Sequence, residues 1–286
     1  MNTRNKTSLN SLLFVITILF LSSSFSALAQ QTAYYNNPQK QYATAMDLFT
    51  QEKYAAAKEL FDDCIANDEN GADKMNASYY SAVCSEKLQQ PDAETLFLNL
   101  CDDYPSNSIT QLAQFHLGNI YYTQKKFDKA IAAYAKVDLF DLTDNEKTDY
   151  KFRFGYCYFS KQDYTKALPF FEQVKDLESP YYLSANYYYA YICYTKKNYN
   201  DALSSFKLLE GSKQYAAVLP YYISNIYFLQ KKYQQAIDYA EPKLNDATLS
   251  YKSELQQLVG KSYFNLENYQ AALPLLSSWF KTSTLN

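Results

Sequence analysis

The residue types that most often perform chemistry do not stand in a known catalytic spacing in this chain. His116 is the only histidine, and no serine or cysteine motif accompanies it that could give it the role of a general base. The sequence contains no Cys-x-x-Cys pair, Walker loop, Gly-x-Ser-x-Gly or His-Glu-x-x-His segment. We therefore predict a non-enzymatic protein without a cofactor, with His116 on the surface or at the edge of a groove.

An acidic stretch between Asp138 and Glu146 is the only candidate for a metal site. It lacks the glycine and the ligand spacing of a calcium loop, so we predict that no metal is bound there. Thr143 and Glu146 instead have the spacing of a capping box, which predicts that a helix begins after Thr143.

Five cysteines could bear on redox chemistry, and they are Cys64, Cys84, Cys101, Cys157 and Cys193. Each lies within an apolar pattern of helical spacing, which favours buried free thiols over structural disulfides. Cys64 and Cys84 are the one pair that could meet where two neighbouring hairpins pack, so a disulfide between them stays an alternative.

The elements that carry these residues are indicated by a sequence pattern that repeats seven times, an aromatic residue followed three places later by alanine. The six clear copies are Tyr54–Ala57, Phe127–Ala130, Tyr164–Ala167, Tyr199–Ala202, Tyr233–Ala236 and Tyr269–Ala272, and Gln90–Ala93 is a degraded copy. The seven anchor alanines lie 36, 37, 37, 35, 34 and 36 residues apart. A period in this range predicts stacked helical hairpins, each too small to bury its apolar face alone.

Two further positions recur at fixed distances from the anchor. A small residue lies twelve places before it, where the two helices of a hairpin would approach closely: Ala45, Ser81, Gly118, Gly155, Ala190, Ser224 and Gly260. Four places after the anchor a larger side chain is expected to wedge between hairpins: Phe61, Phe97, Tyr134, Phe171, Phe206, Ala240 and Leu276. The sequence therefore predicts an all-α solenoid of about seven hairpins.

With these small residues, aromatics and spacings, residues 36–280 resemble the tetratricopeptide repeat family. The resemblance implies a right-handed superhelix that binds other proteins, although repeats of this kind bind many unrelated partners. More narrowly, the chain resembles tyrosine-rich exported repeat proteins of Gram-negative, Bacteroidota-like cell envelopes. The second copy departs from the pattern because Gln90 replaces the aromatic residue.

The resemblance also implies that residues fifteen, eleven and eight places before each anchor line a concave groove. In the second copy these would be Ser78, Ala82 and Ser85. In copies three to six they form the candidate partner-binding groove: Phe115, Asn119, Tyr122, Phe152, Tyr156, Phe159, Tyr187, Tyr191, Tyr194, Tyr221, Asn225 and Phe228. The groove lysines of the family's chaperone-binding members are missing, because Phe115 and Tyr221 stand where the first would be needed.

Several functions are compatible with this aromatic groove. Our main hypothesis is an interaction scaffold that holds an extended peptide or a partner helix, with asparagines on the backbone and tyrosines on the side chains. The alternatives are that the rings only pack against one another, that tyrosines stack on the sugars of a glycan or of peptidoglycan, or that the array is purely structural.

Residues 1–29 have the pattern of a signal peptide, with Arg4 and Lys6 before an apolar run and small residues before Gln30. Cleavage there predicts export to the periplasm or the periphery of the outer membrane, with a short segment at residues 30–35 before the array. The remaining chain has 25 basic and 30 acidic side chains, so no electrostatic footprint for nucleic acid is expected.

Two surface features complete the predictions. A row of lysines lies at the hairpin turns, and we interpret it as solvated turn residues rather than a basic ridge for an acidic partner. These are Lys125, Lys126, Lys161, Lys196, Lys197, Lys231 and Lys232. Trp279, just before the tail at 281–286, would stand at an uncovered apolar edge of the last hairpin, which predicts self-association.

Overall fold

A computed structural model describes residues 38–67, 73–105 and 107–283. The predicted signal peptide, the segment 30–35 and the last three residues of the tail lie outside the described residues. The described chain contains fourteen α-helices and two short 3₁₀ helices and no strand, so the all-α fold class is confirmed. It divides into two compact parts. The first part consists of the residues up to 124 together with 135–141, and the second part consists of residues 125–134 together with those from 142 onward.

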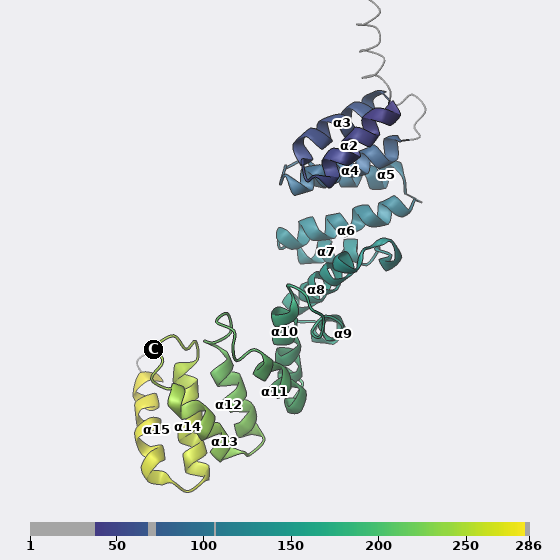
Figure 1. The fold of residues 1–286 in the computed structure, drawn as a ribbon. Helices are drawn as coiled ribbons and strands as arrows, with labels where there is room; N and C mark the ends of the chain where they lie inside the picture. The colour runs from purple at the N-terminus through teal and green to yellow at the C-terminus, as the bar shows by residue number, and fades with distance from the viewer. Residues whose placement is uncertain (1–37, 68–72, 106, 284–286) are drawn as a thin grey trace, which may run out of the picture. The chain divides into compact units, whose positions relative to one another are not determined.

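The first part contains two complete hairpins and one further helix (Figure 1). Its helices are α2 (Pro38–Thr50), α3 (Tyr54–Asn67), α4 (Lys74–Lys87), α5 (Ala93–Asp103) and α6 (Ser108–Thr123), followed by η1 (Leu139–Asp141). Each helix packs on the next in chain order, and α4 also contacts α6. This is the nearest-neighbour packing that a repeat array requires.

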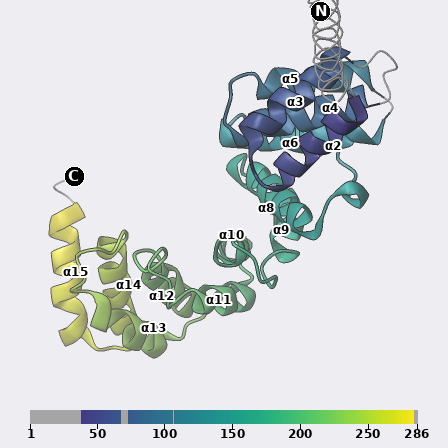
Figure 2. The same cartoon turned by 45° about the horizontal axis from the view of Figure 1, so that its top comes forward.

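The second part begins with α7 (Phe127–Tyr134) and continues with four hairpins (Figures 1 and 2). These are α8 (Asp144–Ser160) with α9 (Tyr164–Glu172), α10 (Tyr182–Thr195) with α11 (Tyr199–Leu208), α12 (Leu219–Leu229) with α13 (Tyr233–Ala240), and α14 (Lys252–Asn265) with α15 (Tyr269–Ser283). A short η2 (Glu241–Lys243) follows α13. The capping box predicted before α8 is present, since Thr143 and Glu146 bond to each other's backbone N–H groups.

Seven turns join a first helix to a second helix, including the turn between α6 and α7, and all of them use the same backbone conformation. One residue in each has a positive φ of 56–62°: Glu52, Gln89, Lys125, Gln162, Lys197, Lys231 and Glu267. In six of these turns the N–H of this residue and that of the next donate to carbonyls three and five residues earlier, which is the Schellman helix end. Glycine and asparagine usually occupy this conformation. Because glutamate, glutamine and lysine stand at these positions here, the sequence did not predict the left-handed residue.

The second repeat is one residue shorter in its turn than the others. Gln89, the residue with positive φ, lies four places before Ala93, whereas this distance is five in the other six repeats. The second helix α5 accordingly begins at Ala93, after Pro91, rather than at the position of Gln90. When the repeats are aligned on the anchor alanine, the positions of α4 are therefore wrong by one residue. In the other repeats the small residue stands seven places before the residue with positive φ, and in α4 this position is Ala82 rather than Ser81.

The predicted wedge residues join successive hairpins through ring stacking. Four of the seven, each fully buried, stack on an aromatic ring of the next first helix, with ring centroids 4.8–5.5 Å apart. The pairs are Phe61–Tyr80, Phe97–His116, Phe171–Tyr188 and Phe206–Tyr222. This contact recurs because the period places an aromatic residue at the same point of these four interfaces.

The predicted small-residue pair is also present within a hairpin. A Cβ added to Gly155 would lie 2.7 Å from Phe170 Cβ and 3.6 Å from the carbonyl oxygen of Ala167, the anchor. Two helices can approach this closely only if one of the contacting residues has no side chain. The close contact of α8 with α9 is therefore the reason for glycine in the middle of a helix.

Candidate functional site

The candidate groove residues of the second part lie on three successive first helices, α8, α10 and α12. Eight of the nine side chains are partly exposed, namely Tyr156, Phe159, Tyr187, Tyr191, Tyr194, Tyr221, Asn225 and Phe228. Phe152 is only 5% exposed, because it stacks on Tyr181 at 4.2 Å, so its ring offers almost no surface to a partner. The structure thus brings eight of the predicted residues to one partly exposed aromatic surface, which we call the aromatic face.

Rings of the aromatic face contact one another and the buried rings of Tyr215 and Tyr222. Tyr191 of α10 lies 5.5 Å from Phe159 of α8 and 5.9 Å from Tyr222 of α12, each in an edge-to-face arrangement. Tyr187 stacks on Tyr215 at 4.7 Å. Such contacts hold the rings in fixed orientations, so little side-chain entropy would be lost when a partner binds.

Asn225 is held by hydroxyl groups of the same surface. Its Nδ2 donates to the Tyr194 hydroxyl at 2.6 Å and to the Tyr221 hydroxyl at 3.4 Å. Both amide hydrogens are therefore used within the chain, and the side-chain oxygen is the atom with which Asn225 could accept a bond from a partner's backbone N–H.

Four phenols of the aromatic face are held in the neutral form. Burial raises the pKa of Tyr194 to about 12, and the pKa values of Tyr187, Tyr191 and Tyr221 also rise, in each case mainly because of desolvation. Neutral phenols donate and accept hydrogen bonds, but they are poor nucleophiles. These hydroxyls can therefore serve as hydrogen-bond donors and acceptors at the surface.

The candidate residues of the first part lie on α6 and are less accessible. Phe115 is 3% exposed and Asn119 is 8% exposed, whereas Tyr122 is half-buried. An extended aromatic surface like that of the second part is therefore not formed by these three residues.

His116 is buried at 6% exposure, so its predicted surface position is wrong. Its ring stacks on Phe97 with centroids 4.8 Å apart and an interplanar angle of 2°. Nδ1 lies 2.5 Å from Oε2 of Glu86, and Nε2 lies 3.0 Å from the Tyr79 hydroxyl. His116 occupies the same stacking position as Tyr188 and Tyr222 in later repeats, fourteen places before the anchor, and this periodic position was the sequence signal for burial.

With the corrected register of α4, three other residues replace the predicted groove residues of the second repeat. Tyr79, Val83 and Glu86 stand where the anchor alignment had placed Ser78, Ala82 and Ser85. Tyr79 and Glu86 are the two partners of His116. The sequence analysis missed both, because the shortened turn is not visible in the residue types.

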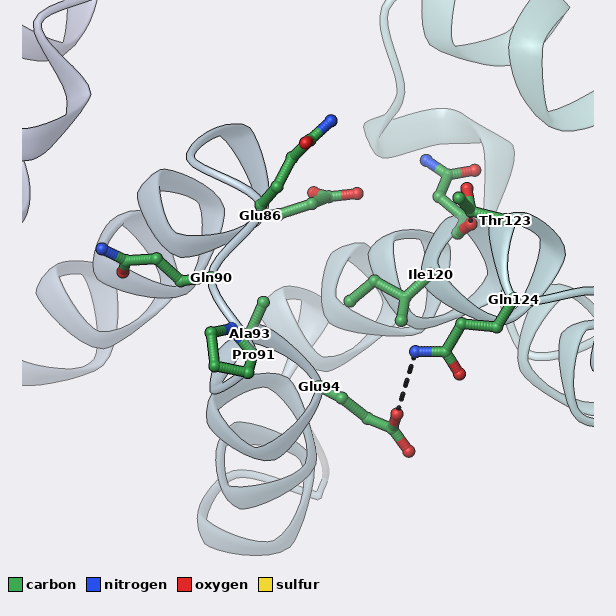
Figure 3. Close-up of a pocket in the computed structure, with 10 residues that line it drawn as sticks. Glu86, Gln90, Pro91, Ala93, Glu94, Ile120, Thr123 and Gln124 are labelled. Atoms are coloured by element: carbon green, nitrogen blue, oxygen red, sulfur yellow. Dashed lines mark hydrogen bonds between the residues drawn. The ribbon is translucent and has the colours of Figure 1, made fainter.

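Glu86 also lines a cavity of about 500 Å³ between the α4–α5 turn, α5 and α6, which we call the α4–α6 pocket (Figure 3). Polar side chains of Glu94, Asn119, Thr123 and Gln124 line it as well, together with the apolar Pro91, Ala93 and Ile120. Figure 3 shows residues of the turn and α5 on one side and residues of α6 on the other, with Gln124 Nε2 3.4 Å from Glu94 Oε2. Asn119 is the one residue of this lining that the sequence analysis predicted as a site residue.

The cysteines are free thiols, as the helical pattern predicted, and four of the five are buried. Burial raises the pKa of Cys84 to about 11 and that of Cys157 to about 12, which disfavours the reactive thiolate. Cys64 and Cys84 do not form a disulfide.

The described part of the chain contains no group of three or more His, Cys, Asp or Glu side chains that could hold a metal ion. None of its helices combines the length and the apolar content that crossing a membrane requires.

Comparison with known proteins agrees with this architecture. Family models described as tetratricopeptide repeat match residues 113–142, 148–181 and 187–209. Among solved structures, MamA of AMB-1 is similar with a TM-score of 0.52 at 12% identity, over 62% of this chain and 94% of that one. MamA of MSR-1 has a TM-score of 0.50 at 13% identity, over 62% and 98%.

A tetratricopeptide repeat protein from Parabacteroides merdae ATCC 43184 aligns over 85% of this chain and 92% of its own, at 15% identity and a TM-score of 0.47. No curated protein matches the sequence. Identities this low concern the fold alone. The segments matched by the repeat models belong to the tetratricopeptide repeat family, and the other hairpins of the described chain have the same period and packing.

Proposed function

We propose that this chain is a non-enzymatic interaction scaffold whose aromatic face holds an extended peptide segment or a helix of a partner protein. Tetratricopeptide repeats in general bind proteins, and this supports the scaffold role. The observation that carries the proposal is the row of partly exposed rings from Tyr156 on α8 to Phe228 on α12.

The aromatic face has the properties of a peptide-binding surface. Its rings are oriented by contacts such as Phe159–Tyr191 and Tyr191–Tyr222, so they resemble the rigid aromatic anchors at the centres of protein interfaces. No charged residue stands among its eight positions, which favours a partner segment with apolar or aromatic side chains. The neutral hydroxyls of Tyr191 and Tyr194 and the oxygen of Asn225 are suited to the partner's backbone amides.

Tyr191 is the residue to test. Linear peptides would be selected by display on the immobilised chain, and their dissociation constants measured for three variants. We expect Tyr191→Ala to weaken binding at least tenfold, because an aromatic anchor is lost. Tyr191→Phe keeps the ring contacts and reports on the hydroxyl. Tyr182→Ala is the matched control, because Tyr182 is a partly exposed tyrosine of the same helix outside the aromatic face.

Unchanged far-UV circular dichroism of each variant would show that the array is still folded. Peptides that bind Tyr191→Ala as tightly as the unchanged chain, or that respond equally to Tyr182→Ala, would contradict binding at the aromatic face.

We also propose that the scaffold works in the cell envelope of a Gram-negative bacterium, after removal of residues 1–29. The support is the signal-peptide pattern of the sequence. Amino-terminal sequencing of the protein from the periplasmic fraction should begin at Gln30. Retention of the protein in the cytoplasm with residues 1–29 attached would refute this localisation.

Self-association is a further part of the proposal. An apolar patch lies on α14 and α15, the side-by-side pair labelled in Figure 2, where Phe264, Leu273 and Phe280 are 55%, 69% and 63% exposed. Patches of large exposed apolar side chains are typical of interaction sites. Light scattering should show a mass that rises with concentration, and Phe264→Ser with Phe280→Ser should abolish the rise. A concentration-independent monomer would contradict it.

A further inference from the structure

We propose that the α4–α6 pocket is a binding site for a basic side chain, the ammonium of a lysine or the guanidinium of an arginine on a partner protein. This site lies in the first part of the chain, so it adds to the aromatic face of the second part and does not depend on it. Its occupant differs in chemistry, because the aromatic face is uncharged and the pocket is acidic.

The pocket has the size and the mixed lining that a long basic side chain requires. Its volume of about 500 Å³ is in the range of small-ligand sites, which is ample for one side chain. Pro91, Ala93 and Ile120 supply an apolar wall against which the methylene groups could pack, while Glu86 and Glu94 supply negative charge for the head group. Lysine and arginine have this same division into an apolar stem and a charged end.

No lysine or arginine of the described chain pairs with either carboxylate of the pocket. Glu86 uses Oε2 for Nδ1 of His116, whose Nε2 in turn faces the Tyr79 hydroxyl. Glu94 is close to the amide of Gln124 and accepts a hydrogen bond from Tyr121, which contributes, after burial, to the raised pKa of that phenol. Among the residues that the structure describes, no lysine or arginine forms an ion pair with Glu86 or Glu94.

These partners hold the two carboxylates in place. Hydrogen-bond donors orient a carboxylate, and a basic side chain that enters the pocket would then find both groups already positioned. Asn119 and Thr123 add a side-chain amide and a hydroxyl to the same wall and could accept further hydrogen bonds from an ammonium or guanidinium group.

The charge of the first part supplies a second, independent reason for a cationic partner. Residues 38–124 and 135–141 contain 15 acidic and 6 basic side chains, a net charge of −9. Residues 125–134 and 142–286 contain 15 acidic and 19 basic side chains, a net charge of +4. A surrounding field of negative sign raises the association rate of positively charged segments, so the pocket stands in the half of the chain that attracts them.

The main rival occupant is a divalent metal ion. The pocket supplies only two carboxylates, and no group of three His, Cys, Asp or Glu side chains in the described residues is suited to a metal. Its apolar wall would also leave much of an ion's coordination shell without oxygen ligands. A basic side chain uses both the charged and the apolar parts of the lining, and we therefore favour it.

The proposal can be tested with small probes by NMR. Nα-acetyl-lysine methylamide and Nα-acetyl-arginine methylamide would be titrated into the ¹⁵N-labelled chain, with the norleucine analogue as a probe of similar length without charge. We expect the basic probes to shift the amide signals of Gln90, Glu94, Ile120 and Thr123 and the norleucine probe to leave them unchanged. Glu94→Gln should weaken binding at least fivefold, and raising the salt from 50 to 300 mM should weaken it as well.

Glu178→Gln is the matched control, since Glu178 is an exposed glutamate that lines a cavity in the second part. It should leave the affinity for the basic probes unchanged. Equal shifts with the norleucine probe, shifts confined to residues outside the pocket, or an affinity insensitive to Glu94→Gln would each overturn the proposal. Calcium chloride that produced the same shifts at lower concentration would overturn it in favour of an ion site. Loss of peptide binding in Tyr191→Ala has no bearing on these outcomes, so the two proposals fail separately.

Discussion

Replacement of Gly155 by alanine tests the close contact between the two helices of a hairpin. The added Cβ would lie 2.7 Å from Phe170 Cβ, about 1 Å inside the usual contact distance between carbon atoms. Phe170 Cβ is attached directly to the backbone, so α8 and α9 must separate to relieve the contact. Overpacking of this kind costs about 1–3 kcal/mol.

A second effect of the same substitution has the opposite sign. Gly155 is in the middle of α8, where alanine favours the helix over glycine by about 1 kcal/mol. We therefore expect Gly155→Ala to lower the free energy of unfolding by about 1 kcal/mol in total, which corresponds to a decrease of roughly 2–4 °C in the midpoint for a chain of this size.

A double-mutant cycle separates the two effects. Phe170→Gly, which removes the contacting Cβ together with the ring, should by itself destabilise the chain by about 3 kcal/mol, because a partly exposed ring that contacts Phe154 at 4.8 Å is lost and a glycine is placed in α9. In that background the space beside residue 155 is wider, so Gly155→Ala should become stabilising by up to about 1 kcal/mol. The sign of the substitution should thus reverse with the residue at position 170.

Urea unfolding followed by circular dichroism would measure all four proteins. Gly211→Ala is the control, because a Cβ at this exposed position meets nothing within 4 Å and should change stability by less than about 0.5 kcal/mol. If Gly155→Ala stabilised the chain in both backgrounds, the helices would have room to spare and the argument from the small-residue pair would be refuted.

Three further predictions concern titrating and buried groups. His116→Tyr, which restores the ring found at this position in later repeats, should be less destabilising than His116→Ala, by about 1–2 kcal/mol in thermal unfolding, and equal losses would contradict the stacking role. Tyr150 and Tyr194 have pKa values raised to about 12, so their contribution to stability is fully present below about pH 10 and is lost as the pH rises to 12. Absorbance at 295 nm should show that these two phenols ionise at higher pH than the exposed tyrosines. A single common transition near pH 10 would refute this. Ellman's reagent should find five thiols after denaturation, with Cys84 and Cys157 at least tenfold slower to react in the folded chain than after unfolding, whereas a count of three would indicate a disulfide.

The repeat pattern of the sequence predicted the hairpins because every hairpin must bury the same face. The second helices of six repeats begin at the aromatic residue three places before the anchor alanine, as in α3 (from Tyr54) and α11 (from Tyr199). The wedge residues Phe61, Phe171 and Phe206 are fully buried at the interfaces where the spacing had placed them. These features are local or repeat with the period, so residue types and their distances along the chain are sufficient to predict them.

The aromatic face was only partly predictable from the sequence. Spacing identified the helices and the side of each helix, but it did not distinguish Phe152, which is covered by Tyr181, from Tyr156, which remains partly exposed one turn later. The difference depends on a side chain 29 residues further along the chain. Burial of a single ring is decided by its neighbours in space, which the helical period does not specify.

By itself, therefore, the sequence determined the all-α repeat architecture, the inter-hairpin wedge residues and the absence of known catalytic motifs. The tertiary structure alone decided that Gln89 ends α4 in the left-handed conformation, which moves Glu86 to the groove side and brings it to His116 and to the α4–α6 pocket. The physical reason is that a shift of one residue in register corresponds to about 100° around the helix axis. A turn that is shorter by one residue therefore changes which side chains of α4 lie on a given side, although the residue types hardly reveal it.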